Sequence, residues 1–196
     1  MASSPIIYYD LGSPYAYLAV ERAERVFEVP ARLQPVLVGG IFVKRGKGSW
    51  AHTSDRQTRM EEVEARAARY GIEAIAWPAD WPNNTLKAMR AAVWADRRVN
   101  GCSFARAAFR RAFREGADLS RVDELVDIAD AVGLPARQLP DAIEDQAIKQ
   151  ALRAATDRAW ACGVVGVPCI EVDEEIFYGD DQLELAKERV DAREAT

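Results

Sequence analysis

YYDLGSPYAYL, at residues 8–18, joins the first predicted strand to the first predicted helix. The apolar run from Ile6 to Tyr9 predicts a short buried strand. Ser13 stands where a helix N-cap belongs, and Pro14 stands at the first helical position, where its missing N–H costs nothing. Apolar residues then recur at offsets of three and four, which predicts a helix. A hydroxyl group is therefore held where a strand gives way to a helix.

The position of Ser13 is compatible with two roles. The first role is to help bind a ligand. Free N–H groups and the dipole at the start of a helix favour an anion, and open α/β folds place ligands at the carboxyl ends of their strands. The alternative is that Ser13 only caps the helix. The local sequence leaves both roles open.

The composition is typical of a soluble globular protein. The chain has 196 residues, of which 49% are hydrophobic and 29% charged, and its net charge is −5. A negative chain is a poor partner for nucleic acid, because phosphate binding needs a basic face. No apolar run approaches the roughly 20 residues of a membrane span, and residues 1–5 lack the features of a secretory signal. We therefore expect a cytoplasmic protein with neither a nucleic-acid nor a membrane partner.

The cysteines predict neither a disulfide framework nor a zinc site. There are three, Cys102, Cys162 and Cys169, and none is in a C-x-x-C pair. We expect each to be a small buried hydrophobic residue. A functional or redox role stays open for Cys169, which follows a proline. His52 is the only histidine, so a His-rich metal site is excluded and no metal is expected.

The predicted elements follow a split order along the chain. A second strand is expected over residues 29–38, which completes a strand–helix–strand unit. A long helical block follows, and the chain ends with a hairpin, over 169–172 and 176–178, and a last helix opened by 179–181. The block is expected to contain helices over 55–71, 86–100 and 145–162, and shorter ones that begin at Ser103, Ser120 and Pro135.

Residues 39–54 are rich in glycine and cations, and we expect them to form a mobile binding loop. A phosphate-binding P-loop does not fit, because Lys47 is followed by Gly48 where that motif requires Ser or Thr. One interpretation is a basic loop that holds a ligand with a carboxylate group. A solvated surface loop is the other.

This order is that of an α/β protein with a thioredoxin-like fold and an all-helical domain inserted after the second strand. The thioredoxin-like domain is expected to comprise residues 1–38 and 160–196, and the insertion residues 39–159. Three stretches, DLGSPYAYL (10–18), GVVGVP (163–168) and FYGDDQL (177–183), resemble 2-hydroxychromene-2-carboxylate isomerases and kappa-class glutathione transferases, within the DsbA-like group.

The resemblance implies a catalytic role for Ser13. In DsbA-like oxidoreductases this turn carries C-x-x-C, whereas residues 13–16 of this chain are SPYA. Without a thiolate, dithiol–disulfide exchange cannot occur at this position. In the serine branch of the family, the hydroxyl and the helix start hold the sulfur of glutathione and favour its thiolate. The expected cofactor is therefore glutathione or another low-molecular-weight thiol.

The resemblance also implies the rest of the thiol site. The bond between Val167 and Pro168 is expected to be cis, so that the Val167 backbone meets a peptide-like ligand as an added strand would. Asp181, beside Asp180, matches the family position that binds the γ-glutamyl end; a plain acidic helix cap is the alternative. The expected binding residues are Pro14, Tyr15, Lys47, Trp50, Val167, Pro168, Asp180 and Asp181.

The chain departs from the family pattern in two places. Gln182 stands where the family has Arg, and residues 45–50 replace a Pro-rich stretch that helps to form the ligand site. These changes bear on which thiol and which second substrate are bound.

The expected function is a thiol-dependent isomerase that acts on a conjugated, aromatic carbonyl compound. Tyr15, Trp50 and Trp77 are candidates to line the substrate pocket. One alternative is a kappa-class-like glutathione transferase, which would release the conjugate. Another is a non-catalytic thioredoxin-fold module that binds peptide strands at Val167. Because members of the family are commonly dimeric, a homodimer is a further expectation.

Overall fold

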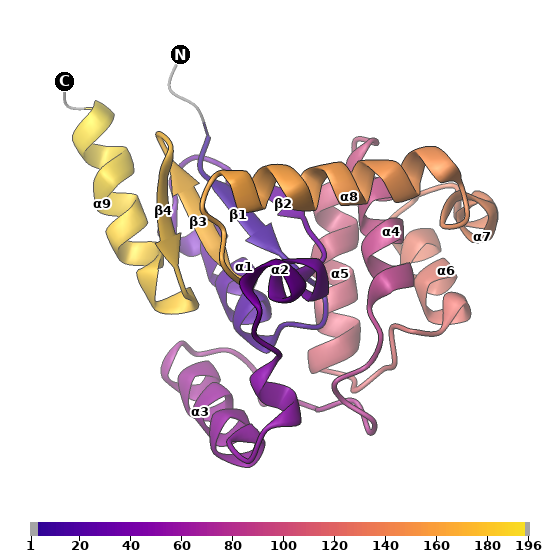
Figure 1. Ribbon diagram of the computed structural model, residues 1–196, viewed down its shortest axis with the longest axis horizontal. Coiled ribbons are helices and arrows are strands. Elements are labelled where there is room, and N and C mark those ends of the chain that lie inside the picture. Colours follow the sequence, from indigo (N-terminus) through magenta and orange to yellow (C-terminus); the bar gives the residue numbers. More distant parts are fainter. Residues whose placement is uncertain (1–3, 195–196) are drawn as a thin grey trace.

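A four-stranded mixed sheet of order β2-β1-β3-β4 is the centre of the computed structural model, which describes residues 4–194 (Figure 1). The first pair of strands is parallel, and the pairs β1–β3 and β3–β4 are antiparallel. Residues 1–3, part of the stretch considered above as a signal, lie outside the described residues. The strands are β1 (Ile6–Tyr9), β2 (Arg32–Pro35), β3 (Cys169–Val172) and β4 (Glu175–Tyr178).

Between β2 and β3, every regular element within residues 4–194 is helical, which confirms the predicted fold class. The division into two domains stays a prediction. Short 3₁₀ turns lie at Trp50–His52, Ala136–Gln138 and Asp180–Gln182. The helices are α1 (Pro14–Val26), α2 (Val38–Arg45), α3 (Arg56–Arg69), α4 (Leu86–Asp96), α5 (Gly101–Phe113), α6 (Val122–Ala131), α7 (Leu139–Ala142), α8 (Gln146–Ala161) and α9 (Leu183–Glu194).

Both faces of the sheet are covered, because successive residues of a strand point to opposite sides. Ile7 and Tyr9 of β1 belong to the larger core, which includes residues of α1, α5 and α9. Tyr8 of the same strand belongs to a smaller core that also contains Ile41 of α2 and Ala159 of α8. In Figure 1, α8 accordingly runs along one side of the sheet, and α9 packs near β4.

The larger core joins the sheet to the helical block. Phe104, Phe109 and Phe113 of α5 are fully buried. The Phe109 ring lies 5.6 Å from that of Tyr9 in β1, and the Phe113 ring lies 5.4 Å from that of Tyr17 in α1. Elements from both parts of the chain therefore stabilise each other through one set of aromatic contacts.

The prediction of a mobile loop over residues 39–54 is wrong for its first half, which is helix α2. One of its glycines, Gly40, has a packing role, and Gly46, with φ of 67°, ends the helix. A Cβ atom at Gly40 would lie only 3.3 Å from Cγ2 of Thr156, so glycine lets α2 approach α8 closely. Ile41, fully buried, then anchors the helix in the smaller core.

Several predicted helix boundaries are also wrong. Helix α5 begins at Gly101, so Ser103 lies inside it and is not its cap. Ser120 forms no capping box with α6; its backbone N–H and its hydroxyl both donate to the Asp118 carboxylate, at 2.9 and 2.8 Å. Strand β2 is shorter than residues 29–38, and α4 ends at Asp96 rather than near residue 100. At Ser120 the error arises because the local capping signal competes with an alternative hydrogen bond.

The predicted burial of the cysteines holds for only one of the three. Cys169 is fully buried in β3, where its thiol donates to the Gly166 carbonyl at 3.3 Å, and burial raises its pKa to about 12. Cys102 and Cys162 are exposed, at the start of α5 and just after α8. A raised thiol pKa and burial both argue against a nucleophilic role for Cys169.

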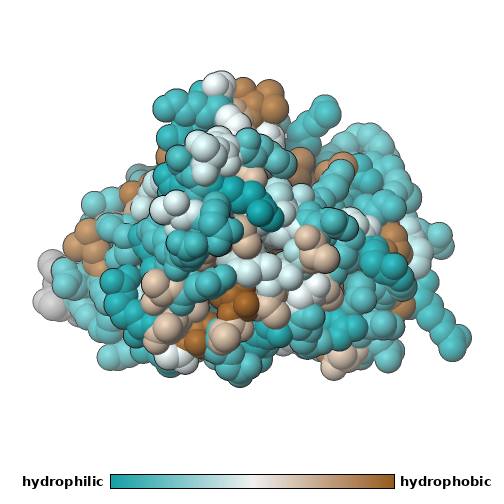
Figure 2. All heavy atoms as spheres, turned by 90° about the horizontal axis from the view of Figure 1, so that it is seen from below, coloured by the Kyte–Doolittle hydropathy of each residue, from teal (hydrophilic) through white to brown (hydrophobic). Residues whose placement is uncertain are grey.

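The face seen in Figure 2 is predominantly hydrophilic, and its hydrophobic residues form small separate groups. Within residues 4–194, no helix combines the length and the apolar character needed to cross a membrane.

We predict that two of the three thiols react in the native protein. At pH 8 a thiol-specific chromogenic reagent should modify Cys102 and Cys162 rapidly and Cys169 only after unfolding, because the Cys169 thiolate is scarce and shielded. The measurement is the number of thiols modified per chain with and without denaturant. Rapid modification of all three in the native state would contradict the burial of Cys169.

Candidate active site

Ser13 is the N-cap of α1, as predicted. Its Oγ accepts a hydrogen bond from the Ala16 N–H at 3.2 Å and donates to the Val167 carbonyl at 3.4 Å. The side chain is half-buried, and Pro14 occupies the first helical position. The structure thus brings together two predicted site residues that are 154 positions apart.

The bond between Val167 and Pro168 is cis in the structure. The Pro168 carbonyl accepts a hydrogen bond from the Gly179 N–H at 3.1 Å, which ties this segment to the residues after β4. The Val167 N–H has no acceptor among residues 4–194. A backbone N–H without an acceptor, next to a carbonyl that makes one long hydrogen bond, can pair with an extended ligand.

The two predicted acidic residues differ sharply in environment. Asp180 is 1% exposed, and its carboxylate forms an ion pair of 2.8 Å with Arg66, whereas about half of the Asp181 side chain is exposed. Burial raises the pKa of Asp180, and the Arg66 guanidinium and the Tyr70 hydroxyl oppose that shift. Asp180 is therefore the structural member of the pair, and Asp181, 3.4 Å from Arg66, is the one open to a ligand.

Arg66 of α3 is a site residue that the sequence did not reveal. Its guanidinium bonds Glu62 at 2.7 and 3.1 Å in addition to Asp180 and Asp181, and it lies 5.5 Å from the ring of Tyr15. The Tyr15 hydroxyl donates to Glu62 at 3.3 Å. An i, i+4 Glu–Arg pair on an exposed helix face is common, so no local signal distinguished it. The pair connects Tyr15 to the acidic end of the site.

The predicted aromatic residues form one cluster, and Trp81 joins them. The ring of Trp50 lies 5.9 Å from that of Tyr15 and 5.2 Å from that of Trp81, and Trp77 lies 4.8 Å from Trp81. Trp81 is buried, and its indole N–H donates to the Gly12 carbonyl at 3.2 Å. Aromatic faces are therefore held beside the turn that precedes Ser13.

Lys47 lies apart from these contacts. It is exposed after the C-terminal end of α2, and its side chain makes no hydrogen bond or ion pair with residues 4–194. Arg45, which was not predicted, instead donates to the Val165 carbonyl at 3.3 Å. The cation next to the segment before Pro168 is therefore Arg45.

Asp10 holds the turn that carries Ser13. Its fully buried carboxylate accepts hydrogen bonds from the N–H groups of Gly12 and Val38, both at 2.9 Å, and from the Thr85 hydroxyl at 2.9 Å. Burial raises the pKa of Asp10, and the three hydrogen bonds oppose that rise. The sequence showed Asp10 only as a turn residue, because its partners are 28 and 75 positions away.

Neither of the two cavities that we describe is lined by Ser13, Val167 or Asp181. A cavity of about 600 Å³ lies among α4, α7 and α8. A small one is lined by Leu11, Gly12 and Trp81, behind the turn. The candidate site is therefore neither of these two cavities.

Comparisons with known proteins identify the family of the chain. The model of the DSBA-like thioredoxin domain matches residues 6–191. The chain belongs to this family. It is 27% identical to a curated 2-hydroxychromene-2-carboxylate isomerase of Sphingobium xenophagum, over 91% of this chain and 93% of that protein. The predicted family and the prediction of an enzyme are thereby confirmed.

Solved structures show the same fold. A 2-hydroxychromene-2-carboxylate isomerase superposes with a TM-score of 0.87 and 19% identity, over 98% of both chains. The cytosolic disulfide reductase DsbM of Pseudomonas aeruginosa, solved with GSH, superposes with a TM-score of 0.61 and 13% identity, also over 98% of both chains. The likeness in fold therefore extends over the whole DSBA-like domain.

We predict that Asp10→Asn destabilises the protein by about 1–3 kcal/mol, because an amide NH₂ replaces one of the oxygens that accept buried hydrogen bonds. Urea denaturation followed by circular dichroism measures the change. The control is Asp127→Asn in α6, which is exposed and should stay within about 0.5 kcal/mol of the parent. Equal unfolding midpoints for the two variants would show that Asp10 does not hold the turn.

We predict that Arg66→Gln lowers the free energy of unfolding by about 1.5–3 kcal/mol, since it leaves the buried Asp180 carboxylate without its guanidinium. Adding Asp180→Asn to this variant should restore part of the loss, which a double-mutant cycle measures. Arg69→Gln, an exposed change on the same helix, is the control. Additive effects of the two substitutions would contradict the pairing.

Proposed function

We propose that this DSBA-like protein is a thiol-dependent isomerase of conjugated, aromatic carbonyl compounds, with glutathione or a similar thiol as its cofactor. The single observation that carries the proposal is the half-buried Ser13 hydroxyl, placed at the N-terminus of α1 and against the Val167 backbone. The similarity to a named isomerase along nearly the whole chain supports the reaction class.

The residues at the site fit a small peptide-like thiol. The Val167 N–H donates no hydrogen bond to any residue among 4–194. Together with the Val167 carbonyl, it offers the two backbone contacts that an added strand would use. Asp181, half-exposed beside Arg66, presents a carboxylate to an ammonium group at one end. Ser13 stands at the other end, where a sulfur would lie.

A thiol supplies the nucleophilic sulfur for reversible addition to a conjugated double bond, which becomes a rotatable single bond until the sulfur leaves. The chain's own cysteines do not provide this group. Cys169 is fully buried, and Cys102 and Cys162 lie at the start of α5 and after α8. An external thiol is therefore part of the proposal.

Ser13 has two tasks in this proposal. Its hydroxyl proton, which makes only a long hydrogen bond of 3.4 Å to the Val167 carbonyl, can be donated to a negative sulfur instead. Its Oγ caps the Ala16 N–H, so the first turn of α1 stays ordered with its dipole directed at the site. Both effects stabilise a thiolate over a thiol, as at the N-terminal cysteines of helices.

The side of the site toward the substrate is aromatic and cationic. Tyr15 and Trp50 provide ring faces next to Ser13, and burial raises the pKa of the Tyr15 hydroxyl, which therefore stays protonated. Arg45, beside the Val165 carbonyl, provides positive charge for a carboxylate on the substrate. The partner in this proposal is a small molecule, and a cytoplasmic location and a homodimer belong to the same proposal.

We predict that Ser13→Ala lowers kcat by about 10²–10³-fold, because one donor to a developing negative charge is removed. The assay follows the conversion of 2-hydroxychromene-2-carboxylate by chromatography in the presence of glutathione. Ser13→Thr keeps both the hydroxyl and the cap, and it should keep most of the activity. Ser103→Ala, an exposed serine in α5, is the control for unrelated effects.

Three readouts complete the test. Loss of the cap costs Ser13→Ala about 1 kcal/mol, so thermal unfolding must show that the variant is folded at the assay temperature. Glutathione should raise the unfolding temperature of the parent protein, since a ligand of the folded state stabilises it. Unchanged turnover in Ser13→Ala would overturn the proposal, and a released thioether conjugate would assign a transferase instead.

A further inference from the structure

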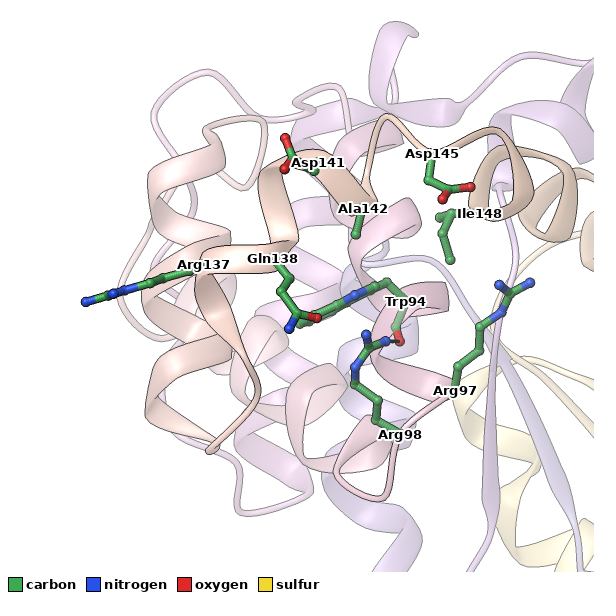
Figure 3. A pocket seen from close by; sticks show the side chains of 9 residues that line it. All are labelled: Trp94, Arg97, Arg98, Arg137, Gln138, Asp141, Ala142, Asp145 and Ile148. Atoms are coloured by element: carbon green, nitrogen blue, oxygen red, sulfur yellow. Dashed lines mark hydrogen bonds between the residues drawn. The ribbon is translucent and has the colours of Figure 1, made fainter.

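The cavity of about 600 Å³ lies at the end of the molecule formed by the C-terminus of α4, helix α7 and the start of α8 (Figure 3). In Figure 1 this end lies beyond α5, away from β3 and β4. Its volume is within the range of small-molecule sites, roughly 300–1,000 Å³. The proposed function makes no use of it.

Three arginines line the cavity, and none forms an ion pair with a residue among 4–194. Arg98 is held in place: its Nη1 donates to the Trp94 carbonyl at 2.7 Å, and its guanidinium lies 4.1 Å from the centre of the Trp94 ring. Arg97 lies at the opposite side of the opening and Arg137 points away from it (Figure 3). Two guanidinium groups therefore retain donors that no protein carboxylate occupies.

The floor between these arginines is apolar. Trp94 and Ile148 are buried residues with atoms at the cavity surface, and Ala142 of α7 adds a methyl group. Gln138 also lines the cavity and adds an amide group to it (Figure 3). An apolar floor under two cationic groups matches a ligand with one charged end and one apolar body.

The acidic residues of the cavity limit the charge of that ligand. Asp145 caps α8 by accepting from the Ala147 N–H at 2.5 Å, and the Asp141 carboxylate points away from Arg97 and Arg98 (Figure 3). Both carboxylates still lie at the rim, where they repel a dianion about twice as strongly as a monoanion. The balance favours a single negative charge.

We propose that this cavity is a second binding site, separate from Ser13, for a small monocarboxylate with an apolar or aromatic body. The carboxylate accepts hydrogen bonds from Arg97 and Arg98, a geometry for which the guanidinium fork is suited. The apolar body covers Trp94 and Ile148.

The probe is sodium benzoate, titrated into the ¹⁵N-labelled full chain and followed by two-dimensional NMR. The Trp94 indole signal, assigned through Trp94→Phe, and backbone amides of residues 94–98 and 142–148 should shift together and saturate. Arg97→Gln and Arg98→Gln should each weaken binding by about tenfold or more. Arg98→Lys tests whether the planar guanidinium itself is needed and should bind less tightly than the parent.

Matched controls decide the outcome. Arg153→Gln changes an exposed arginine of α8 outside the cavity and should leave benzoate binding unchanged. Benzyl alcohol, without the charge, should bind at least about tenfold more weakly than benzoate. Shifts that do not saturate, equal affinity for the alcohol, or full displacement by equimolar inorganic phosphate would overturn the proposal. Since Arg98 also packs on Trp94, Arg97→Gln is the decisive variant if Arg98→Gln unfolds.

Discussion

The carboxylate of Asp10 is the constraint on which the candidate site depends. It is fully buried and accepts three hydrogen bonds. The donors are the Gly12 N–H in the turn after β1, the Val38 N–H at the start of α2, and the Thr85 hydroxyl just before α4. A buried carboxylate is costly unless its lone pairs are used, so these three segments must stay close to it. Because the Ser13 N–H also donates to the Asp10 carbonyl, the start of α1 is fixed by the same residue.

The site itself is assembled from segments that are far apart in the chain. Ser13 comes from the first strand–helix turn, Val167 from the segment before β3, and Asp181 from the turn before α9. The sheet explains this convergence, since β1 pairs directly with β3. The end of β1 and the residue before Pro168 therefore lie side by side. Helix α3, from the helical block, closes the acidic end through Arg66.

The fold could be predicted because most of its signals are local. Alternation of apolar residues, Ser13 with Pro14, and Gly71 and Gly133 with positive φ at helix ends each act within a few residues. Gly40 misled the prediction, because glycine marks both a loop and a close approach of two helices. Thr156, 116 positions later, decides which of the two applies. The predicted burial of Cys102 and Cys162 was wrong for a similar reason, because the exposure of a side chain depends on what packs over it and not on its own polarity.

The sequence by itself determined the family, the order of strands and helices, and the segments that carry Ser13, Val167 and the acidic pair. The order of the elements follows from hydrophobic periodicity, capping and turn chemistry, which depend on neighbouring residues. The family and the site segments follow instead from the resemblance of residues 10–18, 163–168 and 177–183 to a known family. Only the tertiary structure decided that Asp180 is buried while Asp181 is open, that Arg66 joins them to Tyr15, and that Arg97 and Arg98 face a cavity without a carboxylate partner. The reason is that burial and ion pairing depend on residues many positions away, whose approach is set by the packing of whole helices against the sheet.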